Sequence, residues 1–280
     1  MGRLDGRVAM VTGAGRGHAE AVALRFAKEG ASLSICDLIP VKELEDTVGA
    51  KIKALGVKVI CFKTDVSDEA EVNKMVQETI AKFGKIDILA NVVGIAGPTK
   101  DIWQMSLEEW RKTLEINVDS AFLCSRAVIP DMMKRNWGRI INFSSPTGKQ
   151  PLTHRAPYAT SKMAIIGFTR TLAADVGRYN ITVNAICPGT HLERSLELSR
   201  DRAEYMGRTF DAEVFRKRIQ EFQNTPNPKR VPAGRWAADE GYQDRGSGSE
   251  DAAALAAFLA SDDAATMTGQ DLNTDGTCMW

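Results

Sequence analysis

Short apolar runs alternate with longer amphipathic segments along most of this 280-residue chain. The runs are rich in β-branched residues and nearly continuous, as is typical of strands covered on both faces. The predicted strands are Val8–Val11, Ser32–Cys36, Val57–Phe62, Ile86–Ala90, Arg139–Phe143, Ile181–Ile186 and, much later, Asp271–Thr274. This strand–helix alternation predicts a doubly wound α/β fold, with a central parallel sheet between two layers of helices.

The segments between the strands carry helix start and stop signals. A glycine follows three of them, and Ser67 is the expected N-cap of the third. The predicted helices run from near His18 to Gly30, over Val41–Leu55, from Ser67 to Gly84, after Ser106, after Pro157 and over Asp251–Leu259.

The regular pattern weakens after Cys187 and returns at Asp251. A charged stretch, a proline-rich stretch and a Gly/Ser/Asp-rich stretch lie between them: Leu192–Phe222, Asn224–Pro232 and Ala238–Glu250. Because no internal repeat or long low-complexity linker interrupts the chain, we expect a single domain over residues 1–280 with an insertion at residues 190–250.

The composition excludes several classes of protein. Lys+Arg and Asp+Glu balance at 36 each, so no overall charge attracts nucleic acid or an anionic membrane surface. The five cysteines are scattered without C-x-x-C spacing, and no His/Cys/carboxylate cluster predicts a metal site. No secretory signal and no apolar stretch of roughly 18 residues is found. We therefore expect a cytoplasmic protein in a reducing compartment, with no metal.

A glycine-rich segment, Thr12–Ala19, follows the first strand and opens the first helix. Gly13 and Gly17 permit a tight turn and a close approach of the backbone to a pyrophosphate at the positive helix N-terminus. A purely structural turn is the alternative for such a motif taken alone. The strand–turn–helix context favours a dinucleotide site that includes Arg16 and His18.

Asp37 ends the second strand, twenty residues after Gly17. A carboxylate there can accept hydrogen bonds from the adenosine ribose hydroxyls. It would also repel a 2′-phosphate by about 1–4 kcal/mol. Arg16 has the opposite effect, because its guanidinium could pair with that phosphate. Asp37 therefore favours NAD over NADP, and a turn or helix-capping role is its alternative interpretation.

Tyr158 and Lys162 are four residues apart and share one face of a predicted helix. A free phenol has a pKa near 10, too high for a base at neutral pH. A neighbouring ammonium and the charge of an oxidised nicotinamide both favour the phenolate. Ser145 follows the strand Arg139–Phe143, where its hydroxyl could hold a substrate oxygen.

In their order, these motifs resemble those of the short-chain dehydrogenase/reductase family over nearly the whole chain. The motifs are Thr12–Ala19, Asp65–Val66, Asn91–Gly94, Asn117, Ser145, Tyr158–Lys162, Pro188–Gly189, Phe258–Asp262 and Thr268–Gln270. The resemblance implies a single Rossmann-type domain that binds a nicotinamide dinucleotide.

The resemblance also implies roles for single residues. Tyr158 would be the acid/base, Lys162 its cationic partner, Ser145 the group that orients the substrate, and Asn117 the holder of a relay water. The residues expected to contact the cofactor are Gly13, Arg16, Gly17, His18, Asp37, Asp65, Val66, Asn91, Gly94, Tyr158, Lys162, Pro188, Gly189 and His191.

Some positions depart from the family pattern. Ala19 replaces a glycine, His18 an apolar residue, Val92–Val93 an Asn–Ala pair, and Glu193 a threonine. None of these departures touches the four residues with implied catalytic roles.

The resemblance also assigns the insertion at residues 190–250 to a lid over the substrate. His154 lies four residues before Tyr158 and could bind substrate together with Ser145 and Tyr158, although the sequence slightly favours an ordinary loop histidine. A small basic excess in the insertion is compatible with an anionic substrate or with a solvated helix face.

We therefore expect an NAD-dependent oxidoreductase that interconverts a secondary alcohol and a ketone, with a small alcohol or carbonyl compound as substrate. The family commonly forms homodimers or homotetramers, and no nucleic acid or membrane partner is expected. The alternatives are an NADPH-dependent carbonyl reductase, which Arg16 favours, a non-catalytic dinucleotide sensor, and a lyase or epimerase that retains its NAD.

Overall fold

A computed structural model describes residues 2–189, 213 and 249–274 of the chain. In it, seven parallel strands form one sheet, as the alternating pattern predicted. The strands are β1 Val8–Thr12, β2 Ser32–Asp37, β3 Val59–Lys63, β4 Ile88–Asn91, β5 Gly138–Phe143, β6 Ile181–Pro188 and β7 Asp271–Thr274. Each predicted strand is present, and no strand end differs from its prediction by more than two residues. The predicted doubly wound fold is therefore confirmed.

The described helices match the predicted ones, with additions. They are α1 Gly17–Lys28, α2 Val41–Leu44, α3 Ala50–Ala54, α4 Glu69–Phe83, α5 Leu107–Leu114, α6 Ser120–Arg135, α7 Pro146–Lys149, α8 Ala156–Val176 and α12 Ser249–Ala260. Two π-helical segments, η1 Glu45–Gly49 and η3 Glu115–Asp119, join α2 to α3 and α5 to α6. Short 3₁₀ turns occur at η2 Ile102–Gln104, η4 Gly177–Tyr179 and η5 Asp262–Ala264.

The N-cap predicted for α4 is wrong by one residue. The Asp68 carboxylate accepts the backbone N–H groups of Ala70 and Glu71, at 2.8 and 2.9 Å. Ser67 instead donates its hydroxyl to Asp65, at 2.6 Å. Both residues are good caps, and the sequence alone does not say which one faces the free N–H groups of the first turn.

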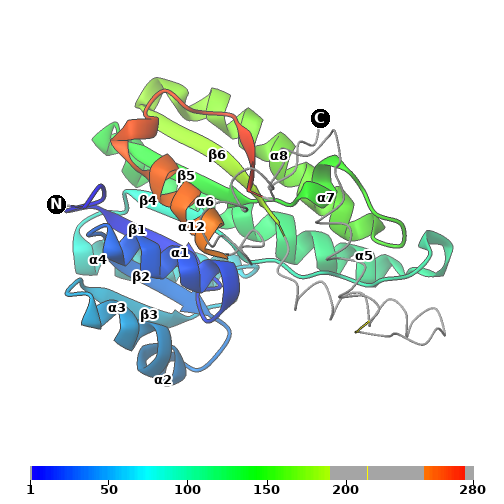
Figure 1. Ribbon diagram of the computed structural model, residues 1–280, viewed down its shortest axis with the longest axis horizontal. Helices are drawn as coiled ribbons and strands as arrows, with labels where there is room; N and C mark the ends of the chain where they lie inside the picture. The colour runs from blue at the N-terminus through cyan, green and yellow to red at the C-terminus, as the bar shows by residue number, and fades with distance from the viewer. Residues whose placement is uncertain (1, 190–212, 214–248, 275–280) are drawn as a thin grey trace.

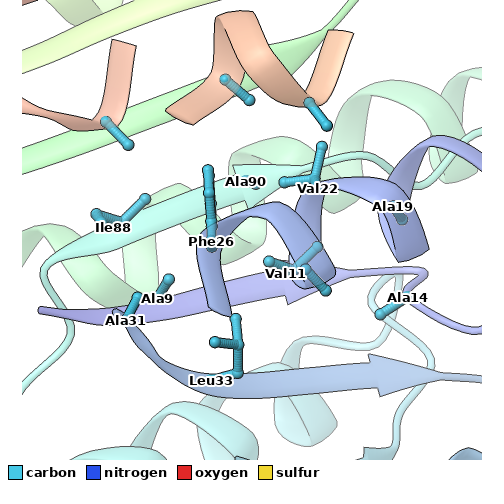
Figure 2. Packing of buried hydrophobic residues seen from close by; sticks show 14 of the residues in the cluster. Ala9, Val11, Ala14, Ala19, Val22, Phe26, Ala31, Leu33, Ile88 and Ala90 are labelled. Atoms are coloured by element: carbon cyan, nitrogen blue, oxygen red, sulfur yellow. The ribbon is translucent and has the colours of Figure 1, made fainter. Parts of the chain in front are cut away.

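Helices cover both faces of the sheet (Figure 1). Residues that alternate along the strands enter different apolar clusters: Ala9 and Val11 pack with α1 and α12, whereas Met10 packs with α4, α6 and α8. Figure 2 shows Val22 and Phe26 of α1 within the first of these clusters. The continuous apolar runs of the sequence follow from this burial on both faces.

Strand β1 lies between β2 and β4 in the sheet order β3-β2-β1-β4-β5-β6-β7. The chain therefore winds outward in one direction from β1 to β3 and in the other direction from β4 to β7. Crevices at the carboxyl ends of strands beside such a reversal are the usual ligand sites of open α/β sheets. The residues that end the strands, including Thr12, Asp37 and Asn91, consequently share one edge.

A buried carboxylate joins the strands at the opposite edge. Asp87 immediately precedes β4, and its Oδ2 accepts the N–H of Val8 at 2.9 Å and the ammonium of Lys85 at 2.9 Å. Its Oδ1 pairs with Arg135 at the end of α6. The backbone N–H of Arg139 donates to the Asp87 carbonyl, at 3.0 Å. This fully buried group fixes the start of β1, β4 and β5 relative to one another.

We predict that Asp87→Asn lowers the free energy of unfolding by about 3 kcal/mol, because it leaves two cations facing a neutral amide at a buried position. Urea denaturation of the purified protein measures the effect. Asp46→Asn is the matched control, since the Lys42–Asp46 pair is exposed to solvent and its loss should change stability little. Equal unfolding free energies for the two variants would contradict this account.

Candidate active site

The glycines of the turn after β1 are required by backbone conformation or by close packing. Gly13 and Gly17 have positive φ angles of 73° and 65°, which favour glycine. A Cβ on Gly13 would lie 2.9 Å from a methyl group of Val93, and one on Gly15 would lie 2.8 Å from Oδ2 of Asp37. The N-cap of α1, Arg16, makes no capping hydrogen bond with its side chain. The N-terminus of α1 therefore follows a closely packed glycine turn without a side-chain cap, which is the setting in which helix N-termini bind phosphate groups.

Asp37 lies beside this turn. Its Oδ2 accepts the backbone N–H of Gly15 at 2.9 Å, and its Oδ1 accepts the N–H of Leu38 at 2.7 Å. It does not cap the following helix, since the N-cap of α2 is Pro40. The carboxylate is therefore fixed next to the turn where the sequence predicted a ribose contact.

Thr12 ties the turn to the neighbouring strand, a role that the sequence analysis missed. Its hydroxyl lies 3.4 Å from the Ala90 carbonyl and accepts the N–H of Val92 at 3.1 Å. The ends of β1 and β4 are consequently held together under the cradle.

Asp65 and Val66 follow β3 at the same edge. Oδ1 of Asp65 accepts both the hydroxyl and the backbone N–H of Ser67, at 2.6 and 2.9 Å. These hydrogen bonds lower the pKa of the Asp65 carboxyl, with the Ser67 hydroxyl as the largest cause. Val66 is buried. Contact of this pair with adenine remains a prediction.

Asn91 is directed into the protein. Its side-chain N–H₂ group donates to Asn142 Oδ1 at 2.9 Å and to Ser125 Oγ at 3.1 Å. The side chain thus joins β4 to β5 and α6. This arrangement fits a supporting role for Asn91 behind the cofactor edge, and a direct cofactor contact stays a prediction.

Gly94 lies where the predicted cofactor and catalytic residues meet. A Cβ built on it would lie 3.1 Å from Lys162 Nζ and 3.3 Å from Asn117 Oδ1. A side chain at residue 94 would therefore require Lys162 or Asn117 to shift by a few tenths of an ångström.

The Asn117 side chain clamps the segment after Gly94. Its Oδ1 accepts the N–H of Ile95 at 2.7 Å, and its Nδ2 donates to the Ile95 carbonyl at 3.0 Å and to Ser161 Oγ at 2.9 Å. The Ser161 hydroxyl in turn donates to the Tyr158 carbonyl, at 2.8 Å. Asn117 therefore positions the loop against α8. The relay water expected there remains a prediction.

Lys162 is a buried cation beside Tyr158. Its side chain is 4% exposed, and Nζ donates to the Phe143 carbonyl at 2.8 Å. The same atom lies 5.8 Å from the centre of the Tyr158 ring. Burial lowers the pKa of Lys162 from 10.5 to about 8. The Lys162 carbonyl accepts the Ser144 hydroxyl at 2.7 Å, which fixes this turn of α8 to the end of β5.

Ser145 begins α7, a short helix that the sequence analysis missed. Its hydroxyl accepts the N–H of Thr147 at 3.1 Å, so Ser145 is the N-cap. A Cβ on Gly148 would lie 2.8 Å from the Lys162 backbone, which shows how closely α7 packs on α8. Lys149 at the end of α7 pairs with Asp271 at 2.8 Å. Ser145 is thus held beside the helix that carries Tyr158 and Lys162.

His154 has a protein partner. Its Nδ1 lies 2.8 Å from Oδ1 of Asp101, and its backbone has a positive φ of 61°. The predicted substrate contact is therefore left to the other ring nitrogen and stays a prediction. His18 packs near Phe143, with ring centres 6.2 Å apart.

The last predicted cofactor contacts lie at and beyond the end of β6. Pro188 ends this strand and Gly189 follows it in a buried position. His191 and Glu193 lie outside the described residues, as does nearly all of the predicted lid at residues 190–250.

Other features of the described residues bear on the expected chemistry. Cys36, Cys61, Cys124 and Cys187 are buried free thiols, and burial raises the pKa of Cys36 to about 12. Among the described residues, no three His, Cys, Asp or Glu side chains come together as metal ligands. No helix within the described ranges has the length and apolarity needed to cross a bilayer.

Comparisons with known proteins identify the family to which the chain belongs. The family model for short chain dehydrogenases matches residues 7–200. An uncharacterized oxidoreductase of Thermotoga maritima is 33% identical, with 97% of each chain covered. A 3-oxoacyl-[acyl-carrier-protein] reductase of Synechocystis is 32% identical and covers 99% of this chain and 98% of its own.

The crystal structure of an NAD⁺-bound xylitol dehydrogenase is similar over the whole fold. Its TM-score is 0.82 at 32% identity, and the match covers 98% of this chain and 99% of that one. The identity and coverage exceed what a shared fold alone would give. The chain belongs to the short-chain dehydrogenase family, and it is an NAD(P)-dependent oxidoreductase that acts on CH–OH groups.

Proposed function

We propose that the protein is an NAD-dependent dehydrogenase that interconverts a secondary alcohol and a ketone, with Tyr158 as the acid/base. The observation that carries this proposal is the buried Lys162 ammonium, 5.8 Å from the Tyr158 ring and next to Gly94 at the carboxyl edge of the sheet. A cation at this position favours the phenolate form of the tyrosine.

The residues at the edge fit a dinucleotide. Gly13 and Gly15 allow the turn to pack closely against Val93 and Asp37, and Arg16 makes no side-chain capping hydrogen bond at the N-terminus of α1. These groups would hold the pyrophosphate, and Asp37 would hold the adenosine ribose. The bound nicotinamide supplies the site that accepts or gives the hydride.

The protein's own residues would move the proton. In the oxidative direction Tyr158 takes the proton of the substrate hydroxyl, and Ser145 donates a hydrogen bond to the same oxygen as it becomes an alkoxide. Such groups stabilise charge that develops during the reaction. Lys162 holds its charge beside the phenol at neutral pH, since its pKa is about 8.

Asp37 supports NAD as the cofactor. Its carboxylate is fixed by the Gly15 N–H, so it cannot move far to make room for a 2′-phosphate. The similar xylitol dehydrogenase was crystallised with NAD⁺, which supports the same choice. The alternative is an NADPH-dependent carbonyl reductase. The exposed Arg16 in the turn and the similarity to an acyl-carrier-protein reductase favour that alternative.

The substrate we propose is a small alcohol or carbonyl compound, acted on in the cytoplasm by a homodimer or homotetramer. Phe122 on α6 and Met163 on α8 are 44% and 50% exposed, which supports assembly through these helix faces.

Tyr158→Phe is expected to lower kcat/KM by roughly 100- to 10,000-fold, since the phenol is the group that exchanges the proton. The absorbance of reduced nicotinamide, measured with a panel of secondary alcohols, polyols and hydroxy acids, gives the rate. Tyr179→Phe makes the same chemical change just beyond the far end of α8 and should leave the rate unchanged. A Tyr158→Phe enzyme that keeps its activity would overturn the proposed mechanism.

The wild-type enzyme is expected to use NAD with a higher kcat/KM than NADP. Asp37→Asn keeps an acceptor for the Gly15 N–H but removes the charge. It should therefore shift the preference toward NADP by between about 5-fold and several hundred-fold. Asp46→Asn, an exposed change of the same kind, is the control. Faster turnover of the wild type with NADPH and a ketone would favour the reductase instead.

The lowered pKa of Lys162 predicts a dependence of stability on pH. The folded protein loses this proton near pH 8, whereas the unfolded chain holds it to about 10.5. The folded state thus binds fewer protons between these values, and the stability of the wild type relative to Lys162→Met rises by about 1.4 kcal/mol per pH unit there. Denaturation of both proteins at pH 7 and at pH 9 measures this difference. A constant difference would mean that Lys162 titrates normally.

A further inference from the structure

We propose that Arg155 is a positioning residue for Tyr158: a second buried cation that holds the phenol ring and favours its ionised form. This inference rests on the proposed role of Tyr158 as the acid/base. Neither the family motifs nor the sequence analysis singled out Arg155.

The geometry places two cations around one ring. The central carbon of the Arg155 guanidinium lies 5.0 Å from the centre of the Tyr158 ring, and Lys162 Nζ lies 5.8 Å from the same point. Both separations fall within the range of cation–π contacts. Arg155 is only 7% exposed, so solvent screens its charge weakly. A nearby positive charge stabilises a phenolate more than a neutral phenol.

A hydrogen bond fixes the guanidinium to another segment of the chain. Its Nη1 donates to Thr99 Oγ1 at 3.0 Å. Thr99 belongs to the β4–α5 loop, residues 92–106, which also contains Gly94. The hydrogen bond therefore holds the guanidinium against the loop that approaches Lys162 and restricts the side chain to one orientation.

Two further contacts join the residue before Arg155 to the same loop. The backbone N–H of Lys100 donates to the His154 carbonyl at 3.1 Å, and His154 Nδ1 lies 2.8 Å from Asp101 Oδ1. Residues 154–155 are thus fastened to residues 99–101 at three points just before α8 begins. Three contacts over so short a stretch fix where Arg155 enters the site.

The charged groups on the surrounding elements set the electrostatic field at the Tyr158 ring. Lys162 of α8 and Arg155 face it directly. In the adjoining β4–α5 loop, Asp101 lies next to His154, and Lys100 pairs with Glu109 of α5. Arg155 and Lys162 are the two cations that lie within 6 Å of the Tyr158 ring centre among the described residues.

A direct titration of Tyr158 tests the proposal without any substrate. The chain has four tyrosines, so the phenolate absorbance of each protein is measured against pH and that of its Tyr158→Phe counterpart is subtracted. Removing a cation at this distance should raise the titration midpoint of Tyr158 in Arg155→Met by on the order of one pH unit. Arg155→Lys keeps the charge and should restore most of the wild-type midpoint. An unchanged midpoint in Arg155→Met would overturn the proposal.

A second, milder variant tests the proposal in case Arg155→Met does not fold. Thr99→Val keeps Arg155 but removes its hydrogen-bond partner, and it should shift the midpoint in the same direction by a smaller amount. If Arg155→Met does not fold, a Thr99→Val midpoint equal to that of the wild type would count against Arg155.

Kinetics separate this proposal from the proposed function. The acidic limb of the kcat/KM profile for NAD reduction should move with the titration midpoint, so that Arg155→Met loses about tenfold near neutral pH and recovers at high pH. A loss of equal size at every pH would indicate a merely structural role. If Tyr158→Phe stays active, the proposed function fails. If Tyr158→Phe is inactive while the Arg155→Met profile is unmoved, only the role of Arg155 fails.

Discussion

The buried ammonium of Lys162 is the group on which the candidate site depends. A cation that is 4% exposed loses most of its hydration, and the structure compensates with the carbonyl of Phe143 at 2.8 Å. The hydrogen bond does not offset the whole cost of desolvation, and burial therefore lowers the pKa of Lys162 to about 8. The elements around it are arranged for this one group: Gly94 and Gly148 allow close approach, and Ser144 fixes the Lys162 carbonyl.

The β4–α5 loop contacts both the glycine turn of the predicted cofactor site and the segment that precedes α8 and its predicted catalytic residues. At its start, the N–H of Val92 is bound by Thr12 under the glycine cradle. A few residues later, Asn117 clamps both backbone groups of Ile95. At residues 99–101 it is fastened to the segment that precedes α8. One loop therefore sets the distance between the predicted pyrophosphate site and the predicted proton-transfer site.

Most of the fold could be predicted from the sequence, whereas several contacts around the candidate site could not. The strands were predicted to within two residues because burial on both faces leaves continuous apolar runs. The spacing of Asp37 from Gly17 and of Lys162 from Tyr158 led to the roles predicted for them, which stay predictions. By contrast, the contacts of Arg155 join residues far apart in the chain, and no local sequence pattern predicts such contacts. The four residues of α7 are too few to show a helical period, and they are held by packing on α8.

The two edges of the sheet use buried charge in different ways. At the amino edge Asp87 has its cations and the N–H of Val8 as partners, so its charge is matched and serves register. At the carboxyl edge Lys162 has a carbonyl partner, and Arg155 adds a second cation near the same ring. Burying a cation is unfavourable for folding, but a positive charge close to the reacting groups stabilises an anion that forms during a reaction. Asp87 thus serves the alignment of the strands, whereas Lys162 and Arg155 lie where a positive charge would stabilise a phenolate at Tyr158.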